Sequence, residues 1–98
     1  MSSRDHALFH FRLYVAGDTQ NSALAQVNLK SLCQTYLMDR YLIEIVDVLR
    51  EPKRALADGI FMTPTLVKLT PFPSRIIVGT LKQTQIVLTA LGLEAVAT

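Results

Sequence analysis

The sequence has 98 residues, half of them hydrophobic and 18% charged, which is typical of one packed domain and excludes a disordered chain. Its net charge of +2 and its scattered Lys and Arg residues do not favour nucleic acid as a partner. A single cysteine excludes a disulfide within the chain, and neither a signal peptide nor the ~20-residue apolar run of a membrane helix is visible. We therefore expect one cytoplasmic domain over residues 1–98, without membrane contact.

The first predicted strand is the apolar and aromatic segment LFHFRLYV at residues 8–15. A helix is predicted over residues 20–37, because apolar side chains recur there with a helical period. We expect Thr19 or Asn21 to cap its first turn by accepting a hydrogen bond from a backbone N–H. The apolar stripe of this helix consists of Ala25, Leu29, Leu32 and Tyr36.

Residues 41–48, YLIEIVDV, predict a second strand rich in Ile and Val. A short helix is expected from Pro52, a residue that suits the first helical turn, to about Asp58. Two more strands are predicted at residues 65–70 and 74–80, and the short Pro-containing turn between them makes them antiparallel.

The final segment, residues 82–93, reads as a closing helix, although its β-branched residues also suit a strand. With this helix the order is β-α-β-α-β-β-α, which is the thioredoxin-like arrangement of an α/β fold. Pro64 stands between the second helix and the third strand, where thioredoxin-like proteins place a cis proline. We therefore expect the Thr63–Pro64 bond to be cis.

Thiol redox chemistry requires an exposed thiolate of low pKa, and the sequence offers none at the expected place. The loop after the first strand, residues 17–22, contains no cysteine, and Cys33 falls inside the predicted helix. We expect Cys33 to be a buried hydrophobe and the fold to be a binding scaffold.

His6 and His10 are too far apart along a strand to form a metal site, and no cofactor is expected. Asp47 is expected to cap the turn after the second strand.

Several short motifs occur together along the chain. They are LYVAG at 13–17, NS at 21–22, VDVL at 46–49 followed by Pro52, TPTLVK at 63–68, and RII at 75–77 followed by Gly79, Thr80 and Leu81. Through these motifs the chain resembles the KaiB family of small circadian-clock proteins over roughly residues 9–93. One motif alone would not be specific, but the combination is.

The resemblance implies a non-enzymatic regulatory role. Members of the family bind the N-terminal ring of a KaiC-type ATPase, help to sequester a KaiA-like protein and reset KaiC phosphorylation. The family is also metamorphic: its ground state is a homo-oligomer, a dimer or tetramer, with the order βαββααβ, and its thioredoxin-like form is a monomer or weak dimer. Two other functions stay open, a KaiB-like module for another signalling partner such as a histidine kinase, and a thioredoxin-fold oxidoreductase.

The resemblance also implies which residues bind partners. Leu24 replaces a basic residue and Glu44 replaces a lysine of the clock members, whereas basic residues are retained at Arg12, Lys68 and Arg75. A reversed charge at an interface weakens binding to the original partner, so we expect this chain to have a partner of its own. The complete predicted set is Phe9, Arg12, Leu24, Leu42, Glu44, Lys68 and Arg75.

The predicted fold-switch positions are Pro64, Gly79, Ala90 and Gly92. Ala90 stands where the clock members have Gly, which favours a helix by roughly 1 kcal/mol and with it the thioredoxin-like form. Gly92 stands where they have Asp and acts against that preference. The second strand is expected at an edge of the sheet, where Glu44 either leaves room for an added strand or prevents its addition.

Overall fold

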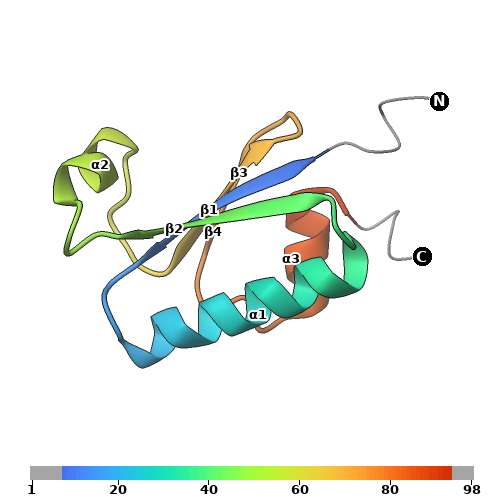
Figure 1. Cartoon of the computed structure of the whole chain (residues 1–98), viewed down its shortest axis with the longest axis horizontal. Coiled ribbons are helices and arrows are strands. Elements are labelled where there is room, and N and C mark those ends of the chain that lie inside the picture. The colour runs from blue at the N-terminus through green and yellow to red at the C-terminus, as the bar shows by residue number, and fades with distance from the viewer. Residues whose placement is uncertain (1–7, 94–98) are drawn as a thin grey trace.

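The computed structural model of the chain describes residues 8–93 and contains the seven elements in the predicted order (Figure 1). Each element begins and ends within two residues of its prediction, and β4 and α3 are the most shortened. His6 lies outside the described residues. The elements are β1 (Phe9–Val15), α1 (Gln20–Tyr36), β2 (Tyr41–Asp47), α2 (Pro52–Ala57), β3 (Thr65–Thr70), β4 (Arg75–Val78) and α3 (Thr84–Leu91).

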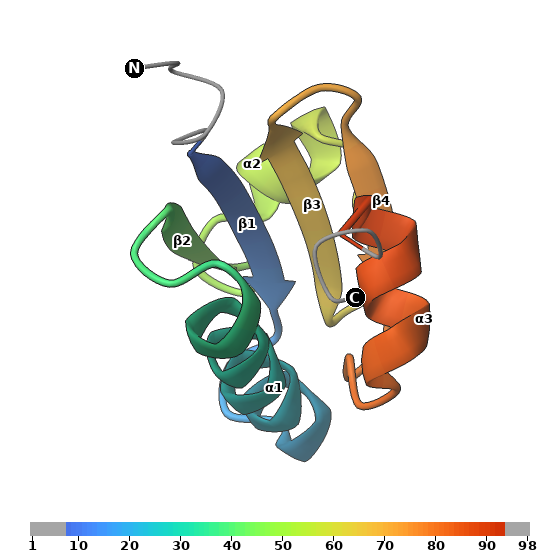
Figure 2. The ribbon, with the colours of Figure 1, turned by 90° about the vertical axis from the view of Figure 1, so that its right-hand side faces the viewer.

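The four strands form one sheet in the order β2-β1-β3-β4 (Figure 2). The central strand β1 runs parallel to β2 and antiparallel to β3, and β3 runs antiparallel to β4. Helices α1 and α3 cover one face of this sheet, and α2 covers part of the other. This topology confirms the predicted thioredoxin-like α/β arrangement, with β2 at one edge and β4 at the other.

Alternation along β1 divides its side chains between the two faces of the sheet. Phe11, Leu13 and Val15 pack with α1 and α3 in the larger core, whereas Tyr14 packs with Val46 on the face toward α2. The α1 stripe enters the larger core as predicted. Its buried or partly buried members are Ala25, Leu29, Leu32 and Tyr36.

The turns at the carboxyl ends of β1 and β2 are held by side-chain hydrogen bonds. Thr19 occupies the N-cap of α1 but its side chain makes no capping bond, and Asn21 lies inside the helix, so the predicted cap is wrong. Instead, the buried Ser22 hydroxyl accepts a hydrogen bond from the Ala16 N–H at 3.0 Å. Asp47 Oδ1 accepts a hydrogen bond from the Leu49 N–H at 2.9 Å, which confirms that Asp47 caps the turn after β2.

The C-terminal segment that suited either helix or strand is a helix, α3. Ala90 lies within α3, and Gly92 ends it in the left-handed conformation, with φ of +76°. This conformation is accessible to glycine because it lacks a Cβ atom. After Gly92 the chain turns back, and Leu93 is 1% exposed in the larger core. The Thr63–Pro64 bond is cis, as predicted.

Candidate functional site

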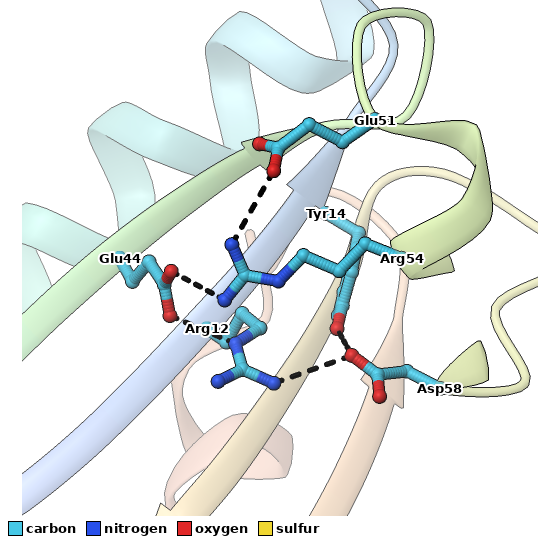
Figure 3. A network of polar contacts seen from close by, with 6 residues as sticks. All are labelled: Arg12, Tyr14, Glu44, Glu51, Arg54 and Asp58. Carbon is cyan, nitrogen blue, oxygen red and sulfur yellow. Dashed lines mark hydrogen bonds and ion pairs between the residues drawn. The ribbon is translucent and has the colours of Figure 1, made fainter. Parts of the chain in front are cut away.

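Charged side chains from β1, β2 and the α2 region meet on the sheet face toward α2 (Figure 3). Arg12 Nε donates a hydrogen bond to Glu44 Oε1 at 2.8 Å, and Arg54 donates one to the other oxygen of this carboxylate. Arg12 also donates to Asp58 Oδ2 at 3.2 Å, and the Tyr14 hydroxyl donates to the same oxygen. We call this group the charge network; it consists of Arg12, Tyr14, Glu44, Glu51, Arg54 and Asp58.

The periods of strand and helix bring these side chains together. Arg12 and Tyr14 are two residues apart on β1 and therefore point to the same face. The parallel register places Arg12 beside Glu44 on β2. Arg54 and Asp58 are four residues apart, one turn of helix, and so both reach down toward the sheet. The network therefore ties the short helix α2 to two strands.

The electrostatics of the charge network favour its ionised groups. Arg12 and then Arg54 lower the pKa of Glu44, and the hydrogen bond to Glu44 raises the pKa of Arg12. Burial and then the hydrogen bond to Asp58 raise the pKa of Tyr14, which keeps it a neutral phenol. Each of these pKa values moves away from neutrality, whereas acid–base catalysis requires one near the working pH. The arrangement therefore fits a structural role, the attachment of α2 to the sheet, better than a role in proton transfer.

Lys68 lies inside the protein and not on its surface, contrary to expectation. Its side chain is buried, its Nζ donates to the Leu91 carbonyl at 3.1 Å, and Nζ lies 5.9 Å from the centre of the Phe9 ring. Burial and the nearby charge of Arg75 lower the pKa of Lys68. Phe9 in turn packs against the larger core. A role of Lys68 and Phe9 in partner binding stays a prediction, and their placement favours a structural role.

The other predicted partner-binding residues lie at different places on the surface. Leu42 on β2 and Leu24 on α1 are 54% and 44% exposed. Arg75 is exposed on β4, at the opposite edge of the sheet. Arg12 and Glu44 are held in the charge network, so their charges already have partners within the chain. The structure therefore brings together only part of the predicted set.

The edge formed by β2 combines an open strand with apolar surface. Within residues 8–93, β2 pairs with β1 alone. A hollow of about 350 Å³ lies between α1 and β2, and its lining includes Val27, Ile43 and Ile45. Val27 and Ile45 are exposed beside it. We define the β2 edge surface as the outer side of β2 with these exposed neighbours: Leu24, Val27, Leu42 and Ile45.

Cys33 is fully buried in α1, as predicted, and burial raises its pKa to about 12. A thiol in this state is a poor nucleophile, because the thiolate is the reactive form. His10 is partly buried on β1. Among residues 8–93, no group of three or more His, Cys, Asp or Glu side chains is placed to hold a metal ion. In the same range, no helix has both the length and the apolar character needed to cross a membrane.

The segment that builds this sheet and its helices matches one family model. The model is described as the KaiB domain, and it matches residues 12–93. The chain belongs to the KaiB family. The circadian clock protein KaiB3 of Synechocystis sp. is 44% identical over 85 residues, which cover 87% of this chain and 81% of the relative. The circadian clock oscillator protein KaiB of Synechococcus elongatus is 42% identical over 82 residues, covering 84% and 80%.

Solved structures place this KaiB-family chain in the thioredoxin-like fold. The N-terminal domain of Synechococcus elongatus SasA superposes with a TM-score of 0.69 at 18% identity, covering 94% of this chain and 87% of that domain. Chloroplastic thioredoxin z superposes with a TM-score of 0.73 at 19% identity, covering 94% and 83%. At such identities the likeness concerns the fold alone. The family and the fold predicted from the sequence motifs are both confirmed.

Sequence reasoning missed most of the charge network in this KaiB-family chain. Tyr14, Arg54 and Asp58 were not singled out, nor was Glu51, which pairs with Arg54 at 3.5 Å. The available signals were the alternation of Arg12 with Tyr14 and the helical spacing of Arg54 and Asp58. These signals give the direction of the side chains, but only the strand register identifies Glu44 as their common partner.

Proposed function

We propose that this chain is a non-enzymatic regulatory protein that docks on a KaiC-type ATPase and modulates its phosphorylation and ATPase cycle. The observation that carries the proposal is the match to clock relatives at 42–44% identity over more than four fifths of the chain. The buried thiol and the thiol-free loop after β1 are consistent with a scaffold used for binding.

The β2 edge surface is the proposed docking site. Unpaired N–H and C=O groups along an edge strand accept a further strand, and neighbouring apolar pockets receive its side chains. Leu42 and Ile45 supply exposed apolar surface on the two sides of β2. Glu44 is bound by Arg12 and Arg54 and therefore meets a partner as part of a neutralised group. This supports strand addition over the alternative that Glu44 prevents it.

The remaining properties of the proposed function follow from the family. In the thioredoxin-like form the chain acts in the cytoplasm as a monomer or weak dimer, and a KaiA-like protein is a further partner. Pro64, Gly79, Ala90 and Gly92 are the positions at which the fold would switch to an oligomeric form. Ala90 supports the thioredoxin-like form because it stabilises the interior of α3 relative to glycine.

Two variants with gel filtration test the docking proposal. The chain is mixed with the KaiC-type ATPase of the same organism, with ATP or ADP, at several ratios and over hours. We expect co-elution of the wild type and its loss in Leu42→Arg, which places a charge on the β2 edge surface. The matched control, Leu56→Arg, changes an exposed leucine of α2 and should co-elute. Equal binding by both variants would exclude the β2 edge surface as the site.

A second candidate is a KaiB-like module for another signalling partner, such as a histidine kinase. The observation that favours it is the pair of departures from the clock members, with leucine at Leu24 and an acid at Glu44 where they have basic residues. Leu24 is exposed and Glu44 is partly exposed, so both are within reach of a partner. Failure of the wild type to co-elute with the KaiC-type ATPase would favour this candidate.

An oxidoreductase would need a reactive Cys33. With a pKa of about 12, the Cys33 thiol at pH 8 has a thiolate fraction roughly a thousandfold below that of a free cysteine with pKa ≈ 8.5. We expect a chromogenic disulfide reagent to react with the folded chain at the rate of its unfolding and with the urea-unfolded chain rapidly. Fast reaction of the folded chain would instead support the hypothesis that the protein is an oxidoreductase.

A further inference from the structure

The outer side of β4 is a second open strand edge. Within residues 8–93, β4 pairs with β3 alone. The Gly79 N–H donates to the Pro64 carbonyl at 3.0 Å, and the register continues with Ile77 opposite Leu66. Hydrogen-bonded and non-hydrogen-bonded pairs alternate in an antiparallel ladder. The backbone N–H and C=O groups of Ile76 and Val78 therefore point away from β3, toward the open side.

An apolar hollow lies beside β4 on each face of the sheet. On the face of α3, a hollow of about 230 Å³ is lined by Ile77 and by Ile86 and Val87 of the helix. On the opposite face, a hollow of about 160 Å³ is lined by Ile76 and by Phe61 and Met62 of the loop before β3. Val78 borders both. Successive side chains of an added strand point to opposite faces, so the two hollows match its alternation.

Three strongly exposed apolar side chains lie together beside this edge. Phe61 is 85% exposed, Ile76 is 64% exposed and Met62 is 63% exposed. These side chains lie together around one hollow, whereas apolar residues on a monomer surface are usually scattered. A cluster of this kind beside open backbone groups is typical of an interaction site.

The segment of the chain that forms β3, β4 and α3 carries charges of one sign. From Gly59 to Leu93 the sequence contains Lys68, Arg75 and Lys82 but no Asp or Glu. Lys68 is buried, whereas Arg75 and Lys82 are exposed at the start of β4 and in the loop after it. A partner that carries carboxylates beside its apolar residues complements these cations. Two copies of this chain joined through β4 would instead bring their cations together without a carboxylate from this segment.

We propose that the β4 edge, defined as the outer side of β4 with Phe61, Met62, Arg75 and Lys82, binds an extended segment of a partner protein by strand addition. The segment has apolar side chains at successive positions, which enter the hollows on the two faces in turn, and Asp or Glu residues at its ends, which face Arg75 and Lys82. This site lies across the sheet from the β2 edge surface. It is independent of docking on a KaiC-type ATPase and provides a second attachment point.

A phage-displayed library of octapeptides, with acidic residues at both ends and a randomised centre, provides the probe. We expect selection on the full chain to enrich β-branched and aromatic residues at the centre. Amide chemical shifts measured with an enriched peptide should change most at Ile76 and Val78. Changes centred on Leu42, or no enrichment at all, would overturn the proposal. Concentration-dependent self-association that shifts the same amides without peptide would assign the edge to a second copy and would also overturn it.

Two substitutions separate the backbone contribution from the charge contribution. Val78→Pro removes an outward N–H but leaves the ladder to β3, and we expect it to weaken peptide binding at least about tenfold. Arg75→Glu should weaken binding by about tenfold, whereas Lys30→Glu, which reverses a charge beside β2, should leave it unaltered. Far-UV circular dichroism verifies that each variant is folded. If Val78→Pro fails to fold, the Arg75→Glu and Lys30→Glu pair decides, and equal binding by both would overturn the proposal.

Discussion

The two faces of the sheet are covered to different extents. On the face of α1 and α3, the exposed fraction is at most 1% for Leu29, Leu66 and Leu88. On the other face, α2 buries only Ala55 of its own residues. The first face is held by apolar contact, which is proportional to buried area and has no preferred direction. The second has a smaller apolar cluster around Tyr14 and Val46, and the charge network, whose geometry is directional, adds to it. The larger core therefore supplies most of the stability, and the charge network sets the position of a helix too short to pack firmly.

The largest expected effect is on the apolar face. Leu29→Ala should lower the free energy of unfolding by about 2–5 kcal/mol, because it removes buried methyl groups and leaves a cavity. The matched change on the other side, Leu56→Ala in α2, removes an exposed side chain and should stay within about 0.5 kcal/mol of the wild type. Urea unfolding measures both variants. Similar losses in the two variants would contradict the contrast between the faces.

A smaller effect is expected at the centre of the second face. Tyr14→Phe removes the hydroxyl that donates to Asp58 and should lower the free energy of unfolding by about 1–2 kcal/mol. Tyr41→Phe is the control, since the Tyr41 hydroxyl donates no hydrogen bond to another residue within 8–93. Thermal unfolding followed by circular dichroism compares the two. Equal stability of Tyr14→Phe and wild type would show that the hydrogen bond from Tyr14 to Asp58 does not stabilise the fold.

Glu44→Gln isolates the charge at the middle of the network. Because Glu44 is partly exposed, we expect a loss of no more than about 1 kcal/mol at low salt. This loss should shrink near 1 M salt, where the Debye length is about 3 Å. Asp18→Asn, which neutralises an exposed carboxylate outside the network, should show neither the loss nor the salt dependence. A salt-independent loss would indicate that packing, and not charge, is the cause.

The smallest expected effect is the pH dependence of that same difference. Arg12 and Arg54 lower the pKa of Glu44 in the folded chain, so its contribution is complete above the unfolded pKa of about 4.3. It is lost as the pH falls through the lower folded value, where the carboxylate becomes protonated in both states. The difference between wild type and Glu44→Gln should therefore be constant from pH 7 to about 5 and vanish in stronger acid. Urea unfolding across this range measures it, and a difference that grows on acidification would contradict the assignment.

The elements were predictable from the sequence because their signals are local. Alternation in β1 and the apolar period of α1 follow from neighbouring residues, whereas the cis bond before Pro64 was predicted from its place in the thioredoxin-like order of elements. The burial of Lys68 could not be predicted from neighbouring residues, because it depends on the packing of α3 beside β3. A signal was present, since Lys68 is two residues from the buried Leu66 and shares its face. The motif match led instead to a surface role.

The candidate site was harder to predict because it depends on strand register. Arg12 and Glu44 are 32 residues apart and meet only because β1 and β2 pair in one particular alignment. A shift by a single residue would move Glu44 to the face of α1 and leave Arg12 without this partner. Exposed leucines such as Leu42 were predictable as surface residues. The hollow beside β2 requires α1 to pack against that strand, and the hollow beside β4 requires α3 to pack against β4, so neither hollow follows from one segment alone.

The shallow attachment of α2 has a consequence for fluctuations of the native state. Segments with few buried contacts open locally at a lower free energy than the global transition, and their amides exchange with solvent first. Helix α2 buries only Ala55 of its own residues. Its local opening separates Arg54 and Asp58 from the sheet and exposes Tyr14 and Val46 to solvent. Helices α1 and α3 pack on the other face of the sheet and make no part of this attachment. The molecule thus has a route to a transiently uncovered apolar sheet face that leaves its main core intact.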